Sequence, residues 1–329
     1  MGVRSRRTAD VPLLVQQATD GNARAVARLI SLVEDASPSL REVMALLTPQ
    51  AGHARVIGLT GSPGVGKSTS TSALVAAYRS RGMRVGVLAV DPSSPFSGGA
   101  LLGDRVRMQD HATDDGVFIR SMASRGHLGG LSWATPQALR VLSAAGCDVV
   151  LVETVGVGQA EVEVASLADT TLVLLAPGMG DGIQAAKAGI LEVADVFVVN
   201  KADRDGADQV VRDLRYMQSL GSQSPSQAKV DGKWVAPILK TVAARGEGAE
   251  DVVDAIERHG EWLASTGQLK VRRHKRASDE VEAIALTVLR ARMGDLRGGD
   301  ALARLAARVV EGELDPYSAA DELVGAVAG

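Results

Sequence analysis

The sequence predicts an α/β fold built on a doubly wound, mostly parallel sheet with helical extensions at both ends. Three observations predict it. Short apolar runs alternate with stretches of helical periodicity, and a glycine-rich segment at 61–68 joins one such run to a helix. Both ends of the chain show helical periodicity alone. We therefore expect an N-terminal helical extension (1–50), a P-loop domain (51–248) and a C-terminal helical region (249–329).

Composition narrows the functional class. The 329 residues carry a net charge of −3, which argues against a nucleic-acid-binding protein. A single cysteine, Cys147, excludes a disulfide framework and a Cys-rich zinc site. No apolar run approaches the roughly 18 residues that a membrane helix needs, and the first residues lack a signal sequence. We expect a cytoplasmic protein without nucleic-acid or membrane partners.

The elements follow from periodicity in chain order. Residues 11–47 have apolar side chains at helical spacing, interrupted by Asp20-Gly21-Asn22. Residues 95–131 are rich in glycine and lack periodicity apart from a short run at Val117–Ile119, so we expect a phosphate-sensing loop. Six strands are expected: Val56–Leu59, Arg84–Val90, Asp148–Glu153, Thr170–Leu175, Val196–Val199 and Pro237–Val242.

The segment Gly61-Ser-Pro-Gly-Val-Gly-Lys-Ser68 fits the P-loop pattern G-x-x-x-x-G-K-[ST] in the strand–loop–helix context that the pattern requires. Its backbone N–H groups and the helix N-terminus favour phosphate oxygens. Lys67 is expected to reach the β- and γ-phosphates, and Ser68 to bind Mg²⁺. The predicted phosphate-binding residues are Gly61, Ser62, Pro63, Gly64, Val65, Gly66, Lys67, Ser68 and Thr69.

Two acidic residues end predicted strands beside the P-loop strand. Asp91 follows the run Arg84–Val90, and Glu153 closes Asp148–Glu153. The carboxyl ends of parallel strands border the ligand crevice of such a sheet. Glu153 is therefore expected near Mg²⁺, directly or through water.

A second motif, Asn200-Lys201-Ala202-Asp203, follows the strand Val196–Val199. The Asp203 carboxylate can accept from guanine N1–H and from the 2-amino group, a donor pair that adenine lacks. Lys201 is expected along the base, and Asn200 is expected to brace the loop. The segment Thr241-Val242-Ala243 follows another strand and is expected to present backbone N–H groups to guanine O6. Together the motifs predict a P-loop GTPase fold that binds GTP and GDP.

The C-terminal region shows packing features rather than chemistry. The basic run Lys270–Arg276 has no interleaved aromatic residues and is expected to be a solvated start of a helix. After it, apolar side chains recur at helical spacing, at Val281, Ile284, Ala285, Val288 and Leu289. Such a stripe must be buried against the core or a second subunit.

Several stretches together resemble the MeaB/ArgK family of G proteins. They are the P-loop, Val90–Pro95, Gly99–Met108 (GALLGDRVRM), Arg120–Gly130 (RSMASRGHLGG), Glu153–Gln159 (ETVGVGQ) and Asn200–Asp203. The resemblance implies a GTPase chaperone of adenosylcobalamin-dependent methylmalonyl-CoA mutase that gates cofactor loading and forms a homodimer through its C-terminal helices.

The resemblance also implies site residues. It maps Ser68, Asp91, Asp104 and Glu153 to the magnesium site. Lys67 and Glu153 are expected to take part in catalysis, together with Gln184 and Lys187 from the loop Gly178–Gly189. Val157 stands where Ras-like GTPases carry a water-orienting Gln, which predicts slow unassisted turnover. Two alternatives remain open: a kinase of an amino-acid transport system, and a metallochaperone GTPase.

Overall fold

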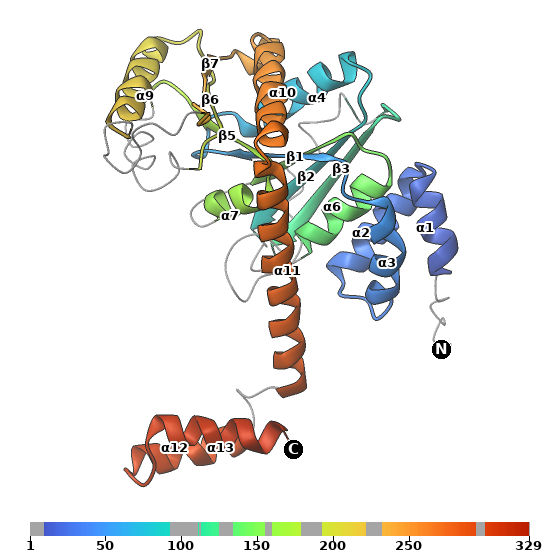
Figure 1. Ribbon diagram of the computed structural model, residues 1–329, viewed down its shortest axis with the longest axis vertical. Coiled ribbons are helices and arrows are strands. Elements are labelled where there is room, and N and C mark those ends of the chain that lie inside the picture. The colour runs from blue at the N-terminus through green and yellow to red at the C-terminus, as the bar shows by residue number, and fades with distance from the viewer. Residues whose placement is uncertain are drawn as a thin grey trace, which may run out of the picture. The chain divides into compact units, whose positions relative to one another are not determined.

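The computed structural model describes residues 10–92, 111, 113–124, 134–154, 160–178, 193–221, 232–293 and 300–328, with the side chains of Asp91 and Pro92 left undescribed. The chain forms two compact units, one that ends at Arg273 and one that begins at His274. The first unit holds the sheet (Figure 1).

The sheet confirms the predicted α/β class. Its described strands all pair in parallel, in the order β3-β2-β4-β1-β5-β6-β7. Their bounds are β1 Arg55–Thr60, β2 Val85–Pro92, β3 Val117–Ser124, β4 Val149–Thr154, β5 Thr170–Leu175, β6 Val196–Val199 and β7 Ile238–Lys240. Strands β4, β5 and β6 are buried throughout, as their uninterrupted apolar sequences predict.

One strand was missed from the sequence. The short run at Val117–Ile119 is the start of β3, which lies at the edge of the sheet and pairs only with β2. An edge strand tolerates polar residues, and Arg120 of β3 forms an ion pair with Glu34. The predicted loop at 95–131 is therefore interrupted by a strand at 117–124.

Helices cover both faces of the sheet (Figure 1). On one face, the N-terminal helices pack with α6 and α7 against β2 and β4. On the other, α4 and α10 pack against β1 and the centre of the sheet, and α9 covers the side of β5 and β6. The bounds are α1 Val11–Thr19, α2 Ala23–Glu34, α3 Leu40–Leu47, α4 Lys67–Ser80, α6 Thr135–Ala144, α7 Ala160–Leu167, α9 Ala207–Gly221 and α10 Ala249–Ser265.

The N-terminal helices form where the sequence places caps. Asp10 accepts from the N–H of Leu13 at the start of α1, and Asn22 accepts from the N–H groups of Arg24 and Ala25 at the start of α2. Leu29 and Val33 of α2 are fully buried in the core that α6 shares. The N-terminal helices are thus joined to the sheet by apolar packing.

The C-terminal helices follow α10. They are α11 Gln268–Met293, α12 Asp300–Val310 and α13 Pro316–Ala328. None of the described helices is long and apolar enough to cross a membrane. The division of the chain at residues 50 and 248 stays a prediction.

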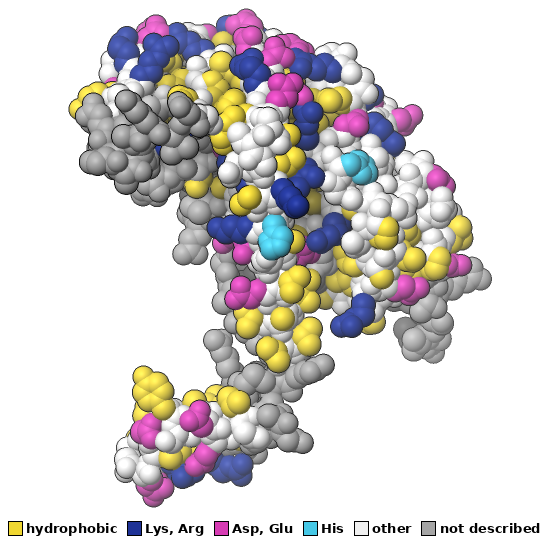
Figure 2. All heavy atoms as spheres, in the orientation of Figure 1, with side chains coloured by type: hydrophobic (Ala, Val, Ile, Leu, Met, Phe, Trp, Pro, Cys, Tyr) yellow, Lys and Arg dark blue, Asp and Glu magenta, His cyan; other side chains and the backbone are white. Residues whose placement is uncertain are grey.

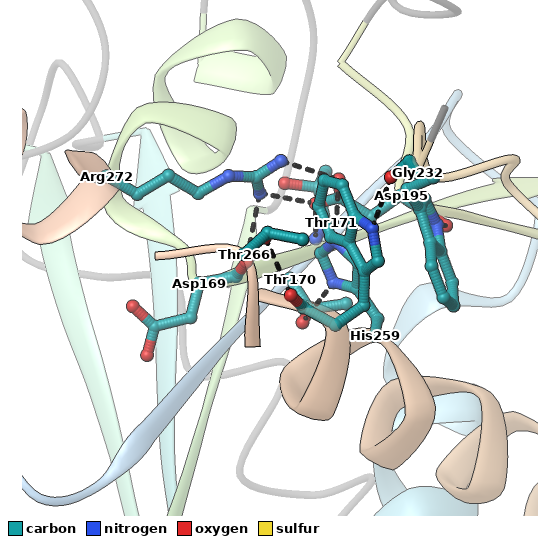
Figure 3. A network of polar contacts seen from close by, with 10 residues as sticks. Asp169, Thr170, Thr171, Asp195, Gly232, His259, Thr266 and Arg272 are labelled. Atoms are coloured by element: carbon teal, nitrogen blue, oxygen red, sulfur yellow. Dashed lines mark hydrogen bonds and ion pairs between the residues drawn. The ribbon is translucent and has the colours of Figure 1, made fainter. Parts of the chain in front are cut away.

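The basic run at the start of α11 is not solvated as expected. The Arg272 guanidinium makes a two-pronged ion pair with Asp195, each N–O distance being 2.8 Å (Figure 3). Its neighbour Arg273 pairs with Asp169 at 2.9 Å. Both aspartates are buried and immediately precede strands β6 and β5. The two arginines therefore tie the first turns of α11 to the amino-terminal edge of the sheet.

Candidate functional site

The P-loop joins β1 to α4, and its glycines adopt conformations that other residues rarely take. Gly61 has φ 142° and Gly66 has φ 97°. A Cβ at Gly61 would lie 2.3 Å from the carbonyl oxygen of Leu174, and one at Gly66 would lie 2.5 Å from the Asn200 amide nitrogen. The loop therefore needs glycine at both positions to lie this close to β5 and to the loop after β6.

Lys67 is the first residue of α4, and its side chain folds back over the loop. The ammonium nitrogen donates to the carbonyl oxygen of Gly61 at 2.5 Å and lies 3.3 Å from that of Ser62. The side chain is largely buried. This places a positive charge within the loop, where the P-loop pattern predicts bound phosphate.

Glu153 lies beside the start of α4 because β4 pairs with β1, with Glu153 opposite Leu59. Its carboxylate is 1% exposed. It accepts from the Ser68 hydroxyl at 2.5 Å, and the Thr71 hydroxyl lies 2.8 Å from its other oxygen. A buried carboxylate is thus oriented by two hydroxyls from one face of α4.

The donors present at this point suit magnesium. Mg²⁺ prefers oxygen ligands, and Ser68 and Glu153 bring a hydroxyl and a carboxylate together. The backbone of Asp91 ends β2, two residues beyond Ala89, which is opposite Glu153. Within the described ranges no three His, Cys, Asp or Glu residues cluster as a metal site. Asp104, Gln184 and Lys187 lie outside the described residues, as does the Asp91 side chain.

Asn200 braces the neighbouring loops, as expected from its motif. Its amide nitrogen donates to the carbonyl oxygen of Val65 in the P-loop at 2.9 Å. Its amide oxygen accepts from the Thr241 hydroxyl at 3.2 Å and from the N–H of Ala243 at 3.0 Å. One buried side chain therefore joins the P-loop to the segment after β7.

Lys201 follows with a positive φ of 56°, which is uncommon for a residue with a side chain. Its ammonium donates to the carbonyl oxygen of Gly64 at 2.6 Å, so the side chain lies across the P-loop. Such strained residues gather at binding sites. Asp203 is 41% exposed and lies 3.7 Å from the Arg245 guanidinium.

The P-loop, the β4 carboxylate and the Asn200 motif thus meet at the carboxyl-terminal edge of one parallel sheet. A family model described as "Methylmalonyl Co-A mutase-associated GTPase MeaB" matches residues 26–295. The chain belongs to the MeaB family. It is accordingly a P-loop GTPase, an enzyme that binds guanine nucleotides and hydrolyses GTP.

Individual relatives agree with the family match. A Pyrococcus abyssi protein, itself assigned as a GTPase by inference, is 44% identical over 317 residues, or 96% of each chain. The mouse protein named "Methylmalonic aciduria type A homolog, mitochondrial" is 36% identical over 217 residues, covering 66% of this chain and 52% of the mouse protein. A crystal structure described as a LAO/AO transport system kinase superposes with a TM-score of 0.72 at 25% identity, covering 99% of this chain and 100% of that one.

Two features of this MeaB-family site escaped the sequence analysis. Thr71 lies three residues after Ser68, a spacing that puts both hydroxyls on one helix face, and this signal could have been used. Arg245 and Glu247 lie beside Asp203 only because the chain turns back on itself after β7. No short-range pattern indicates that proximity.

Proposed function

We propose that this MeaB-family GTPase depends on Mg²⁺ and serves as a chaperone for an adenosylcobalamin-dependent acyl-CoA mutase, with methylmalonyl-CoA mutase as the first candidate. In this role it gates cofactor loading and protects or reactivates the mutase. The family match over residues 26–295 carries the proposal, since that family is described by its association with the mutase.

The site residues take the following roles in this proposal. Lys67 binds the β- and γ-phosphates, the P-loop amides hold the phosphate oxygens, and Asp203 reads the guanine edge. Ser68 and Glu153, with Asp91 and Asp104, hold Mg²⁺, which when bound supplies positive charge at the phosphate oxygens. Glu153 is kept in place by Ser68 and Thr71. Gln184 and Lys187 act near the γ-phosphate.

The proposal also assigns a homodimer and a cytoplasmic location. Supporting the dimer, α11 exposes Val281, Ile284, Val288 and Leu289 on the part that belongs to the second unit. Figure 2 shows hydrophobic side chains gathered along this helix. A second copy of the chain would remove them from water.

The test is a reconstitution with purified methylmalonyl-CoA mutase. We expect the mutase to co-elute with the protein on size exclusion and to raise the GTPase rate, with Mg²⁺ required. A Lys67→Ala variant controls for contaminating GTPase activity. Absence of both a complex and rate stimulation would contradict the chaperone role.

A transport-system kinase is the second candidate, because the superposed crystal structure is described as such a kinase. GTP labelled with ³²P at the γ-phosphate separates the two. Release of label as inorganic phosphate supports the GTPase chaperone, whereas transfer of label to a protein supports the kinase.

A further inference from the structure

The guanine side of the site has an acceptor with no assigned donor. Asp203 is proposed to hold N1–H and the 2-amino group, which leaves the adjacent O6 to be recognised. The sequence predicted that backbone amides of Thr241–Ala243 would do so. In the structure the N–H of Val242 donates to the carbonyl oxygen of Glu247 at 3.0 Å, and the N–H of Ala243 donates to Asn200 at 3.0 Å. Both amides are engaged within the protein.

A charged donor lies beside them. Arg245 ends the short 3₁₀ turn η4 (Ala243–Arg245), and Gly246 and Gly248 then turn the chain back with φ 71° and 78°. Val242 and Glu247 form an antiparallel bridge across this turn. Glu247 is thereby brought against Arg245.

Glu247 fixes the direction of the guanidinium. Arg245 Nε donates to Glu247 Oε1 at 2.7 Å, and Nη2 lies 3.3 Å from Oε2. This pairing uses one edge of the guanidinium fork. The remaining nitrogen, Nη1, lies 3.7 Å from Asp203 Oδ2, at the group proposed to read the base.

Charge favours an arginine in this place. When Asp203 binds guanine N1–H, its carboxylate lies next to the O6 atom, and two electron-rich oxygens then face the same space. A guanidinium between them relieves that repulsion and donates to O6. The side chain is 55% exposed, so nothing in the described residues covers the position that it would share with the base.

We infer that Arg245 is a specificity-determining residue that donates from Nη1 to guanine O6, oriented by Glu247. This inference rests on the proposed contact between Asp203 and guanine. Arg245 would thus read the oxygen that distinguishes guanine from 2-aminopurine and adenine, while Asp203 reads the neighbouring donors.

The test compares GDP with 6-thio-GDP, in which sulfur, a weak acceptor, replaces O6 while N1–H and the 2-amino group remain. Affinities are measured by titration calorimetry at pH 7 for the wild type and for Arg245→Ala. We expect the substitution to weaken GDP about tenfold, as for one charge-assisted hydrogen bond, and 6-thio-GDP less than twofold. Arg245→Lys should fall between the two, because lysine keeps the charge but lacks the fork held by Glu247.

IDP, which lacks the 2-amino group, tests Asp203 separately. Arg245→Ala should keep the wild-type preference for GDP over IDP. If the substitution weakens GDP and 6-thio-GDP equally, or leaves GDP unchanged, the inference is overturned. If the wild type itself does not prefer GDP to IDP, the proposed Asp203 contact fails instead. Arg258→Ala, which removes an exposed arginine on α10, is the matched control and should change neither affinity.

Discussion

At the scale of single residues, the site depends on side chains that serve two loops at once. Asn200 donates to the P-loop and accepts from the segment after β7, and Glu153 accepts from two hydroxyls of α4. Because each of these groups is buried, removing it leaves several partners unsatisfied. Asp203, in contrast, is partly exposed and is available for a ligand. Substituting Asp203 should therefore affect nucleotide choice more than folding.

Asp203→Ala should lose about 2 to 3 kcal/mol of discrimination between GDP and ADP, because the donors of guanine would lose their charged acceptor. A competition assay with a fluorescent GDP analogue measures the loss, and the melting temperature checks the fold. Equal binding of ATP and GDP by the wild type would refute the assigned role.

Turnover without a partner should be slow. Val157 stands where Ras-like GTPases place a water-orienting Gln, so we expect a rate well below ~1 s⁻¹ for the protein alone. Single-turnover phosphate release with excess protein over GTP gives this rate. A purified protein that turns over at tens per second would show that the site is already complete.

At the scale of elements, charged side chains join α11 to strands far away in the sequence. Asp195 precedes β6, accepts from the N–H of Thr171 at 2.9 Å and pairs with Arg272 (Figure 3). His259 of α10 lies fully buried beside it, with its Nδ1 2.8 Å from the Thr170 hydroxyl. Two tryptophans, Trp234 and Trp262, pack on the imidazole. This edge of the sheet carries structural rather than catalytic charges.

Arg272→Ala should destabilise the protein by about 2 kcal/mol, because it leaves the buried Asp195 carboxylate without its main partner. The figure is below that of a fully buried pair, since Arg272 keeps about a third of its side chain exposed. Urea unfolding measures it. In a double-mutant cycle with Asp195→Asn, the two losses should be less than additive; strict additivity would mean that the pair is not coupled.

The His259 imidazole makes stability depend on pH. Burial lowers its pKa to about 4, an effect that Asp195 partly offsets. Between pH 6.5 and 4 the unfolded chain therefore binds a proton that the folded chain does not, so this contribution is lost as the pH falls through that window, up to about 3 kcal/mol. Urea unfolding at several pH values should give a shallower slope for His259→Gln than for the wild type, and an identical slope would exclude His259 as the source.

At the scale of the whole molecule, the chain separates into a unit that contains the nucleotide site and a helical unit that begins at His274. The first buries its apolar side chains in clusters on both faces of the sheet. The second leaves Val281 at 67% and Leu289 at 53% exposure on α11. A monomer with such a stripe is expected to associate.

Ile284→Asp combined with Val288→Asp should convert a dimer into a monomer, because each places a charge in the apolar stripe of α11. Light scattering coupled to size exclusion measures the mass. Glu282→Lys and Thr287→Asp, on exposed polar positions of the same helix, serve as the control. A wild type that is monomeric at micromolar concentration would rule out the proposed dimer.

The sequence by itself determined the α/β class, the P-loop and the strands that are buried on both faces. These follow from local chemistry: Gly61 and Gly66 allow the loop's backbone angles, Lys67 and Ser68 open the helix, and Val149–Val152 are apolar without interruption. The guanine motif was likewise found from its spacing, because Asn200 directly ends β6.

Only the tertiary structure decided which distant groups meet. Strand β3 escaped detection because an edge strand can carry polar residues such as Arg120, and the basic run at 270–276 was misjudged because its partners, Asp169 and Asp195, lie 104 and 77 residues away. The engagement of the Ala243 amide by Asn200 and the approach of Arg245 to Asp203 depend on the chain's return after β7. Pairing of this kind is set by sheet order and loop closure, which short-range periodicity does not encode.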